Sequence, residues 1–185
     1  MPWDHHREFL TRKLAKVAGI IGHCRSLLPT KVKIQIYHAL FGSLINYCHL
    51  VWGTTTKSNV NKLVTLQKKI IRFIANVPYD THAEPLYLSY NIMKFSCIYD
   101  YRLLFSYAFS TLEFIAFLSQ LANLTKRESV FDVRRREFWK VPHFRTNYAL
   151  QSLAHNLPTL LNNIVMNRID IHCITKKTLR TFLCC

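Results

Sequence analysis

The sequence predicts an all-α protein, an irregular bundle of about five to six helices with a poorly structured basic C-terminal part. Half of its 185 residues are hydrophobic, whereas the chain holds only four Gly and six Pro. That balance argues against a disordered chain and against a turn-rich all-β fold. Apolar residues also recur at helical spacing over most of residues 1–124, which places the main helices there.

Two long helices are predicted in the N-terminal part of the chain. Asp4 is the expected N-cap of the first, which runs to about Leu28 because Pro29 stops it. The second covers residues 31–52 and is expected at the centre of the core. Its apolar arc consists of Ile36, Leu40, Leu44, Tyr47 and Val51, with Tyr37, Phe41 and Cys48 at wider angles, and its polar stripe of Gln35, His38, Asn46 and His49.

The third predicted helix, residues 58–76, separates apolar from basic side chains. Val60, Leu63, Val64, Ile70, Ile71 and Ile74 fall on one side, and Lys62, Lys68, Lys69 and Arg72 on the other. No acidic residue interrupts the basic side, so i,i+4 ion pairs do not account for it. The basic side is a candidate phosphate-binding surface, although a solvated surface helix shows the same pattern.

The remaining helices are predicted at 82–95, 96–124 and 149–164, and the tail from residue 167 onward is poorly patterned. A domain over 1–124, a basic and aromatic segment over 125–165 and a tail over 166–185 are therefore expected. The middle segment contains Arg134, Arg135, Arg136 and Arg145 among aromatic residues. Such a mixture suits stacking on unpaired bases and contact with phosphates. An irregular segment covering the helical core, with solvated arginines, explains it equally well.

The formal charge of +15 is unevenly distributed along the chain. Residues 1–79 carry 12 Lys and Arg against 2 Asp and Glu, and residues 125–185 carry 11 against 4, whereas residues 80–124 carry 2 against 4. Two basic regions therefore flank a nearly neutral, apolar one. Such a field attracts polyanions, above all nucleic acid and less often an anionic membrane.

The residues that catalysis or metal binding requires are not arranged for either. The ten acidic residues include no adjacent pair of the kind that holds the ions of two-metal nucleotidyl transfer. The four glycines form no phosphate-binding loop, and no Gly-x-Ser-x-Gly elbow occurs. Histidines and cysteines lack the Cys-x-x-Cys or His-x3-His spacing of zinc sites. No catalytic residue, metal site or cofactor is therefore predicted.

Two features bear on where the chain resides. Six cysteines without the tight spacing of a disulfide framework, and a polar start without a secretory signal, predict reduced thiols in the nucleus or cytoplasm rather than secretion. Residues 103–125 contain a single charge, Glu113, over a length that spans a bilayer. A carboxylate at mid-membrane is costly, so a buried core helix is favoured and a membrane-inserted protein is the weaker alternative.

A series of motifs resembles the region that follows the catalytic palm in LINE-type, jockey-like non-LTR retrotransposon reverse transcriptases. The matching elements are Ile36–Leu40, Leu44–Cys48, Val51–Gly53, Leu66–Arg72, His82–Tyr87, Asn91–Lys94, Val141–Tyr148 and Leu157–Asn162. The resemblance covers roughly residues 8–165. Leu161 departs from it, because the family usually has Trp there. The catalytic Tyr-x-Asp-Asp motif of the family does not occur in this chain.

The resemblance implies a thumb and post-thumb segment of an RNA-directed DNA polymerase that is not an enzyme by itself. Thumb helices hold the template–primer duplex through its backbone, so RNA or an RNA–DNA hybrid is the expected partner, together with the palm and fingers of the parent polymerase. No membrane partner is favoured. Two alternatives remain: a structural helical module that docks on a polymerase palm, and a non-functional remnant of a transposable element.

Overall fold

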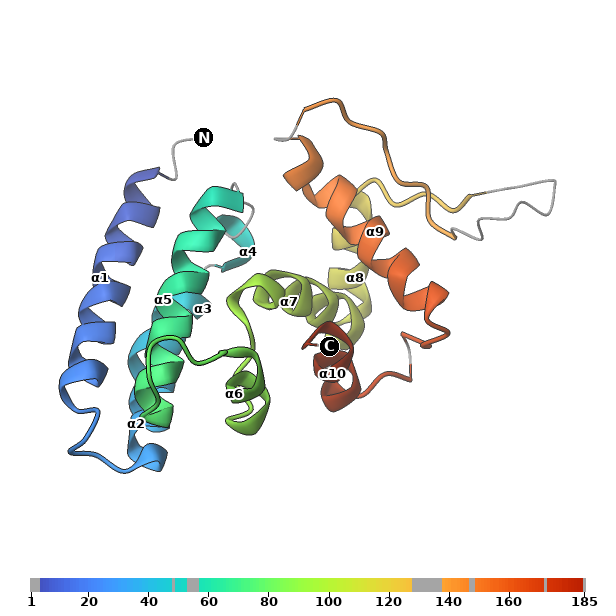
Figure 1. Ribbon diagram of the computed structural model, residues 1–185. Helices are drawn as coiled ribbons and strands as arrows, with labels where there is room; N and C mark the ends of the chain where they lie inside the picture. The colour runs from blue at the N-terminus through green and yellow to red at the C-terminus, as the bar shows by residue number, and fades with distance from the viewer. Residues whose placement is uncertain are drawn as a thin grey trace. The chain divides into compact units, whose positions relative to one another are not determined.

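The computed structural model describes residues 4–47, 49–52, 57–127, 138–146, 149–171 and 173–184 (Figure 1). In these residues the regular secondary structure is helical, and one isolated antiparallel bridge joins Lys126 to Trp139. The predicted all-α class is therefore confirmed. The chain divides into two compact units, residues 1–98 and 99–185, and each is described by itself.

The first unit is built around two long helices that pack against each other, α1 (Asp4–His23) and α5 (Lys57–Ala75). Figure 1 shows them side by side and running in the same direction. Between them in the sequence lie α2 (Thr30–Ile36), η1 (Tyr37–Gly42), α3 (Ser43–Asn46) and α4 (His49–Trp52), and after them α6 (Glu84–Ser89) and the start of α7 (Phe95–Phe109). The third predicted helix, residues 58–76, corresponds closely to α5.

The second predicted helix, over 31–52, is not continuous. Its middle, η1, is a π-helix, whose wider turns hold more residues than the 3.6 of an α-helix. Tyr37, Phe41 and Ile45, which follow one another at intervals of four residues, are all buried. The predicted apolar arc was wrong in part, because Leu40 and Tyr47 are 41% and 67% exposed. The helix then ends at Tyr47, whose backbone is extended.

His49 is a second correction to that helix. The prediction placed it on the polar stripe, whereas it is only 2% exposed and its ring meets the ring of Phe95 edge-on at 5.5 Å. The break at Tyr47 restarts the helix as α4, so the periodicity of residues 31–46 no longer applies to His49. A continuous helical wheel cannot anticipate such a restart.

A fully buried amide, that of Gln67 on α5, joins four segments of the first unit. Its Nε2 donates to the Tyr37 hydroxyl at 2.9 Å and to the Met93 carbonyl at 2.8 Å. Its Oε1 accepts from the Tyr87 hydroxyl at 3.2 Å and from the backbone N–H of Phe95 at 2.8 Å. The amide thus uses both of its N–H groups and both lone pairs. Burial raises the pKa of Tyr37 to about 12 and also raises that of Tyr87, so both phenols stay neutral.

The C-terminal end of α5 is held by cations from the turn after α1 and from α2. Asn76 takes the left-handed conformation, with φ of 58°, that commonly ends a helix. Arg25 donates to the Asn76 side chain at 2.7 Å and to the Val77 carbonyl at 2.8 Å. The buried Lys33 donates to the Phe73 carbonyl at 3.3 Å. Positive charge at this end also complements the helix dipole.

One glycine accounts for the close approach of α1 to α5. A Cβ atom at Gly22 would lie 3.0 Å from the ring of Phe73, so a larger residue there would displace that ring. Gly19, one turn earlier on α1, has open space at the corresponding position. The two helices therefore meet closely near their C-terminal ends because residue 22 has no side chain.

The second unit contains the rest of α7, then α8 (Leu112–Leu121), η2 (Ala149–Gln151), α9 (Leu153–Met166) and α10 (Lys176–Cys184). Its buried core consists of Leu103, Leu104, Ala122, Leu157, Leu161, Ile164, Ile174 and Leu179. The predicted helix over 96–124 is broken between α7 and α8, where the Thr111 hydroxyl accepts from the Phe114 N–H and caps α8. No helix among the described residues combines the length and the apolar character needed to cross a membrane.

The boundary between the units falls between residues 98 and 99, not between 124 and 125 as the sequence predicted. Leu103, Leu104 and Ala122 belong to the core that α9 and α10 complete, so residues 99–124 fold with the C-terminal part of the chain. The tail after residue 166 also differs from the prediction, because it forms α10 and buries Ile174 and Leu179.

Replacing Gln67 with Met tests the amide network. Methionine has a similar shape but would leave two hydroxyls, one N–H and one carbonyl without their partner, so we expect a loss of about 3–5 kcal/mol in unfolding free energy. Urea unfolding followed by circular dichroism measures it. Gln35→Met, at an exposed position of α2, is the control and should change stability by about 0.5 kcal/mol or less. Equal effects at both positions would contradict the network.

Candidate nucleic-acid interface

The predicted basic surface lies on α5, opposite its buried side. Leu63, Gln67, Ile70, Ile71 and Ile74 face the core of the first unit, and the cations occupy the remaining positions. The four cations form two pairs by helical spacing. Lys62 and Lys69 are seven residues apart and lie along one edge of the exposed face, whereas Lys68 and Arg72 are four apart and lie along the other.

Arg72 is engaged within the first unit. Its Nε donates to the Thr81 carbonyl at 2.7 Å, and its guanidinium lies 5.3 Å from the ring centroid of Tyr79. These contacts attach the turn that follows α5 to the helix itself. The sequence predicted Arg72 as a nucleic-acid contact, and the structure shows that its Nε and the face of its guanidinium also have partners in the turn after α5.

Lys68 also lies close to an acidic side chain of the same unit, that of Glu84. Its Nζ lies 3.8 Å from Oε1 of Glu84 on α6, and the other oxygen of Glu84 lies 2.5 Å from Lys94 Nζ. The hydrogen bond from Lys94 and the nearby positive charges lower the pKa of Glu84. No acidic residue of α5 itself interrupts its basic side, as the sequence indicated, and the carboxylate near Lys68 comes from α6.

Lys62 and Lys69 remain as exposed cations on α5. Lys69 Nζ lies 5.7 Å from the ring centroid of Phe73, and the Arg25 guanidinium lies 6.0 Å from the same ring. Neither Lys62 nor Lys69 forms an ion pair with any residue that the structure describes. This edge of α5 therefore presents positive charge that no carboxylate in the described part of the chain neutralises.

The second predicted group of nucleic-acid contacts, the four arginines between residues 125 and 165, lies only partly within the described residues. Arg134, Arg135 and Arg136 lie outside the described residues, whereas Arg145 is exposed in the second unit. The nearby aromatic residue Trp139 is attached to α9. Asn162, which is buried, accepts from the Trp139 N–H at 2.8 Å and donates to the Trp139 carbonyl at 2.9 Å. At Trp139, the segment thus covers the helical core, as one of the two sequence interpretations expected.

Periodicity in the sequence does not reveal the polar residues that organise the first unit. Gln67, Lys33 and Arg25 bond to partners up to 52 residues away, and local periodicity carries no signal for such pairs. Gln67 does fall within the Leu66–Arg72 motif on which the resemblance rests. That motif was the only sequence signal that singled it out.

Nothing in the described part of the chain groups three His, Cys, Asp or Glu side chains in a way that could hold a metal ion. The chain matches no family model, no curated protein and no solved structure. The candidate interface is therefore defined by the geometry of its own cations, and above all by the exposed pair Lys62 and Lys69.

Two substitutions on α5, each of which removes one positive charge, test whether Arg72 supports the fold and Lys69 does not. Arg72→Met removes the hydrogen bond to Thr81 and the contact with Tyr79, so we expect a loss of about 1–2 kcal/mol in unfolding free energy. Lys69→Met removes the same charge from an exposed position and should change stability by about 0.5 kcal/mol or less. Thermal unfolding of both variants measures the difference. Indistinguishable midpoints would show that Arg72 does not fix the turn.

Proposed function

We propose that the first unit binds the phosphate backbone of RNA or an RNA–DNA hybrid through the exposed edge of α5. The observation that carries this proposal is the pair Lys62 and Lys69, both exposed and without an internal carboxylate partner among the described residues. Seven residues of helix rise about 10 Å, or roughly three nucleotides of one strand at about 3.4 Å each. The two ammonium groups can therefore contact separate phosphates of one strand.

The edge is also held rigidly, which favours a binding role. Gln67 lies between Lys62 and Lys69 in the sequence and is fixed by four hydrogen bonds on the buried side of the same helix. Cations on a fixed helix lose less conformational freedom on binding than cations on a mobile loop. Backbone contacts of this kind position a duplex without reading its sequence.

We further propose that the chain represents the thumb and post-thumb segment of a LINE-type reverse transcriptase. Four residues from separate motifs of the resemblance, Tyr37, Gln67, Tyr87 and Met93, bond to one another in a single network. Motifs that are scattered in sequence but meet in one buried network support a shared fold rather than chance similarity. In this interpretation the chain contributes duplex binding, and another part of the polymerase contributes the catalytic carboxylates.

A structural module that docks on a polymerase palm is the second candidate. Exposed apolar side chains on α1 favour it, namely Phe9 and Ile20, which a protein partner would cover. This candidate predicts no affinity for nucleic acid at any salt concentration. The binding experiments below therefore separate the two.

Reversing the exposed pair, Lys62→Glu with Lys69→Glu, should lower affinity for a short RNA–DNA hybrid by at least about tenfold at low salt. The slope of log affinity against log salt should also fall by about 2, because each phosphate contact contributes about 0.9. Fluorescence anisotropy between about 50 and 200 mM salt measures both.

The control for this variant is Lys31→Glu with Lys177→Glu, which removes the same net charge from exposed positions on α2 and α10. It should retain most of the affinity if the α5 edge is the site. Equal losses in the two double variants would mean that net charge alone drives binding and would overturn the assignment.

Removing the Glu84 carboxylate near Lys68 should strengthen binding of the hybrid rather than weaken it. Glu84 keeps its charge at neutral pH because its pKa is lowered, and its pairing is lost only as the pH falls through that pKa. Glu84→Gln should therefore strengthen hybrid binding about two- to threefold at pH 7, because Lys68 becomes available to a phosphate. Asp80→Asn makes the same charge change in the exposed turn after α5 and should have a smaller effect. A larger effect at Asp80 would contradict the role of Lys68.

A further inference from the structure

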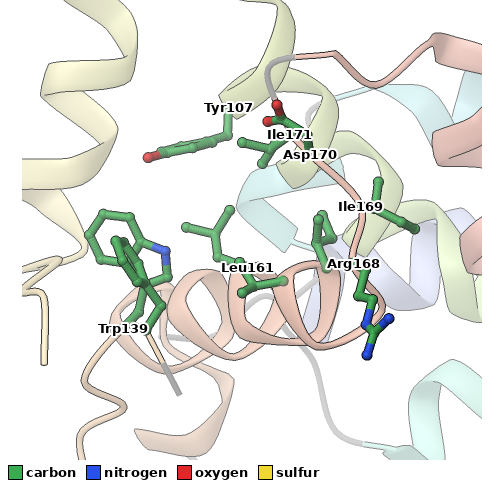
Figure 2. Close-up of a pocket in the computed structure, with 10 residues that line it drawn as sticks. Tyr107, Trp139, Leu161, Arg168, Ile169, Asp170 and Ile171 are labelled. Atoms are coloured by element: carbon green, nitrogen blue, oxygen red, sulfur yellow. The ribbon is translucent and has the colours of Figure 1, made fainter. Parts of the chain in front are cut away.

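The second unit has two apolar features that the proposed function does not use. One is a cavity of about 450 Å³ beside α9, which Figure 2 shows with Tyr107, Trp139 and Leu161 on its walls. The charged side chains at its margin, Arg168 and Asp170, point away from Tyr107 and Trp139 in this view, so neither is placed to hold a ligand against the aromatic wall. The other feature is the exposed side of α8, where the pattern of side chains is more specific.

The helix α8 carries a row of large apolar side chains that the second unit leaves uncovered. Leu118 is 7% exposed and attaches the helix to the unit, whereas Phe114, Phe117 and Leu121 are 40%, 55% and 57% exposed. These three follow one another at intervals of three and four residues, so they lie along one side of the helix and form what we call the apolar row. A continuous row of this kind marks a surface for an apolar partner.

The charge of this region favours a second copy of the chain as that partner. The protein carries a formal charge of +15, yet Glu113 is the only Asp, Glu, Lys or Arg between residues 103 and 124. A nucleic acid or an anionic lipid surface finds no cation on α8 to attract it. Two copies, by contrast, can meet through α8 without placing basic segments of the sequence against each other.

The apolar row matches itself in an antiparallel pair of helices. Its three residues follow the a, d and a positions of a heptad, which face the neighbouring helix in a coiled coil. When Phe117 lies against Phe117 of a second copy, Phe114 of each copy lies against the partner's Leu121, because these residues stand three before and four after Phe117. A second copy therefore offers an apolar contact to each side chain of the row.

The residues that flank the row are also complementary in this pairing. Glu113 and Gln120 are both exposed and both hold g positions, which border the contact between two helices. They stand four residues before and three after Phe117, so an antiparallel pair brings each Glu113 carboxylate beside the partner's Gln120 amide, which can donate to it. Neither side chain has a hydrogen bond or an ion pair among the residues that the structure describes.

We propose that two copies of this chain associate through their α8 helices, which lie antiparallel with the apolar rows in contact and each Glu113 beside the partner's Gln120. The contact is isologous, so it closes as a dimer and does not extend into a filament. This inference goes beyond the proposed binding of nucleic acid and does not depend on it, because it involves no residue of α5.

The size of the contact sets its strength. From their exposed fractions, Phe114, Phe117 and Leu121 together present roughly 300 Å² of apolar surface in each copy. A pair therefore covers roughly 600 Å² at the rows, and the flanking side chains add to it, which is the small end of specific interfaces. We expect a reversible dimer with a Kd of about 10–100 μM.

Sedimentation equilibrium of the full chain over about 5–300 μM tests the proposal. We expect a monomer–dimer equilibrium in this range. A chain that stays monomeric throughout would overturn the proposal, and so would species that grow beyond a dimer. A monomeric chain that sediments with phosphatidylserine vesicles would assign the apolar row to a lipid surface and would likewise overturn it.

Phe117→Glu places two carboxylates at the centre of the contact and should raise the Kd at least about tenfold. The control is Phe9→Glu on α1, which makes the same change at a phenylalanine that is 51% exposed in the first unit. It should leave the Kd unchanged. Equal effects of the two variants would mean that exposed apolar surface in general drives association, and would reject the α8 contact.

Substitutions of Gln120 test the antiparallel register, and they keep the proposal testable if Phe117→Glu fails to fold. Gln120→Lys places an ammonium beside the partner's Glu113 and should tighten the dimer about threefold, whereas Gln120→Glu should weaken it about threefold. Leu112→Lys and Leu112→Glu are the controls, because Leu112 is 85% exposed and lies about 140° around α8 from Phe117. Shifts in the same direction for both charges at Gln120 would contradict the register.

The outcome also separates this inference from the proposed function. A dimer that Phe117→Glu dissociates, in a chain without affinity for the hybrid, would retain the α8 contact and reject the α5 interface. Hybrid binding that depends on Lys62 and Lys69 in a chain that stays monomeric would do the reverse.

Discussion

The first unit depends on one buried amide. Gln67 occupies the buried side of α5 and satisfies all four of its hydrogen-bonding positions with groups from η1, α6, the segment before α7 and the start of α7. An unsatisfied amide at a fully buried site would be costly, so these segments are required to meet at one point. The short and interrupted helices of the unit gain a defined arrangement from this requirement, because apolar packing alone tolerates many arrangements.

The same constraint explains which cations are available to a ligand. With Gln67 facing inward, the helical repeat directs Lys68 and Arg72 toward α6 and the turn before it, where Glu84 and Thr81 engage them. Lys62 and Lys69 are directed to the other edge, where no described carboxylate reaches them. The buried side of α5, where Gln67 lies among apolar residues, thus determines which cations of the opposite side meet other segments and which stay exposed.

Buried polar side chains have different roles in the two units. In the first, buried polar groups such as Gln67 and Lys33 serve the fold, and positive charge is presented on a smooth helix edge that suits a sequence-independent contact with phosphates. In the second, Asn162 fixes Trp139 beside a cavity, and Arg168 accepts a strained backbone at its margin. A helix edge with exposed cations suits contact with a duplex backbone.

The sequence by itself determined the all-α class, the position of α5 and its division into apolar and basic sides, because these follow from local spacing along one helix. It could not determine that residues 37–42 widen into a π-helix, that His49 is buried, or that Glu84 reaches Lys68. It also placed the unit boundary too late, since nothing local shows that Leu103 and Ala122 share a core with α9. Each of these depends on contacts between residues far apart in the chain. Only the tertiary structure decided which cations are engaged and where a cavity remains, because burial and pairing are properties of packed segments and not of their spacing.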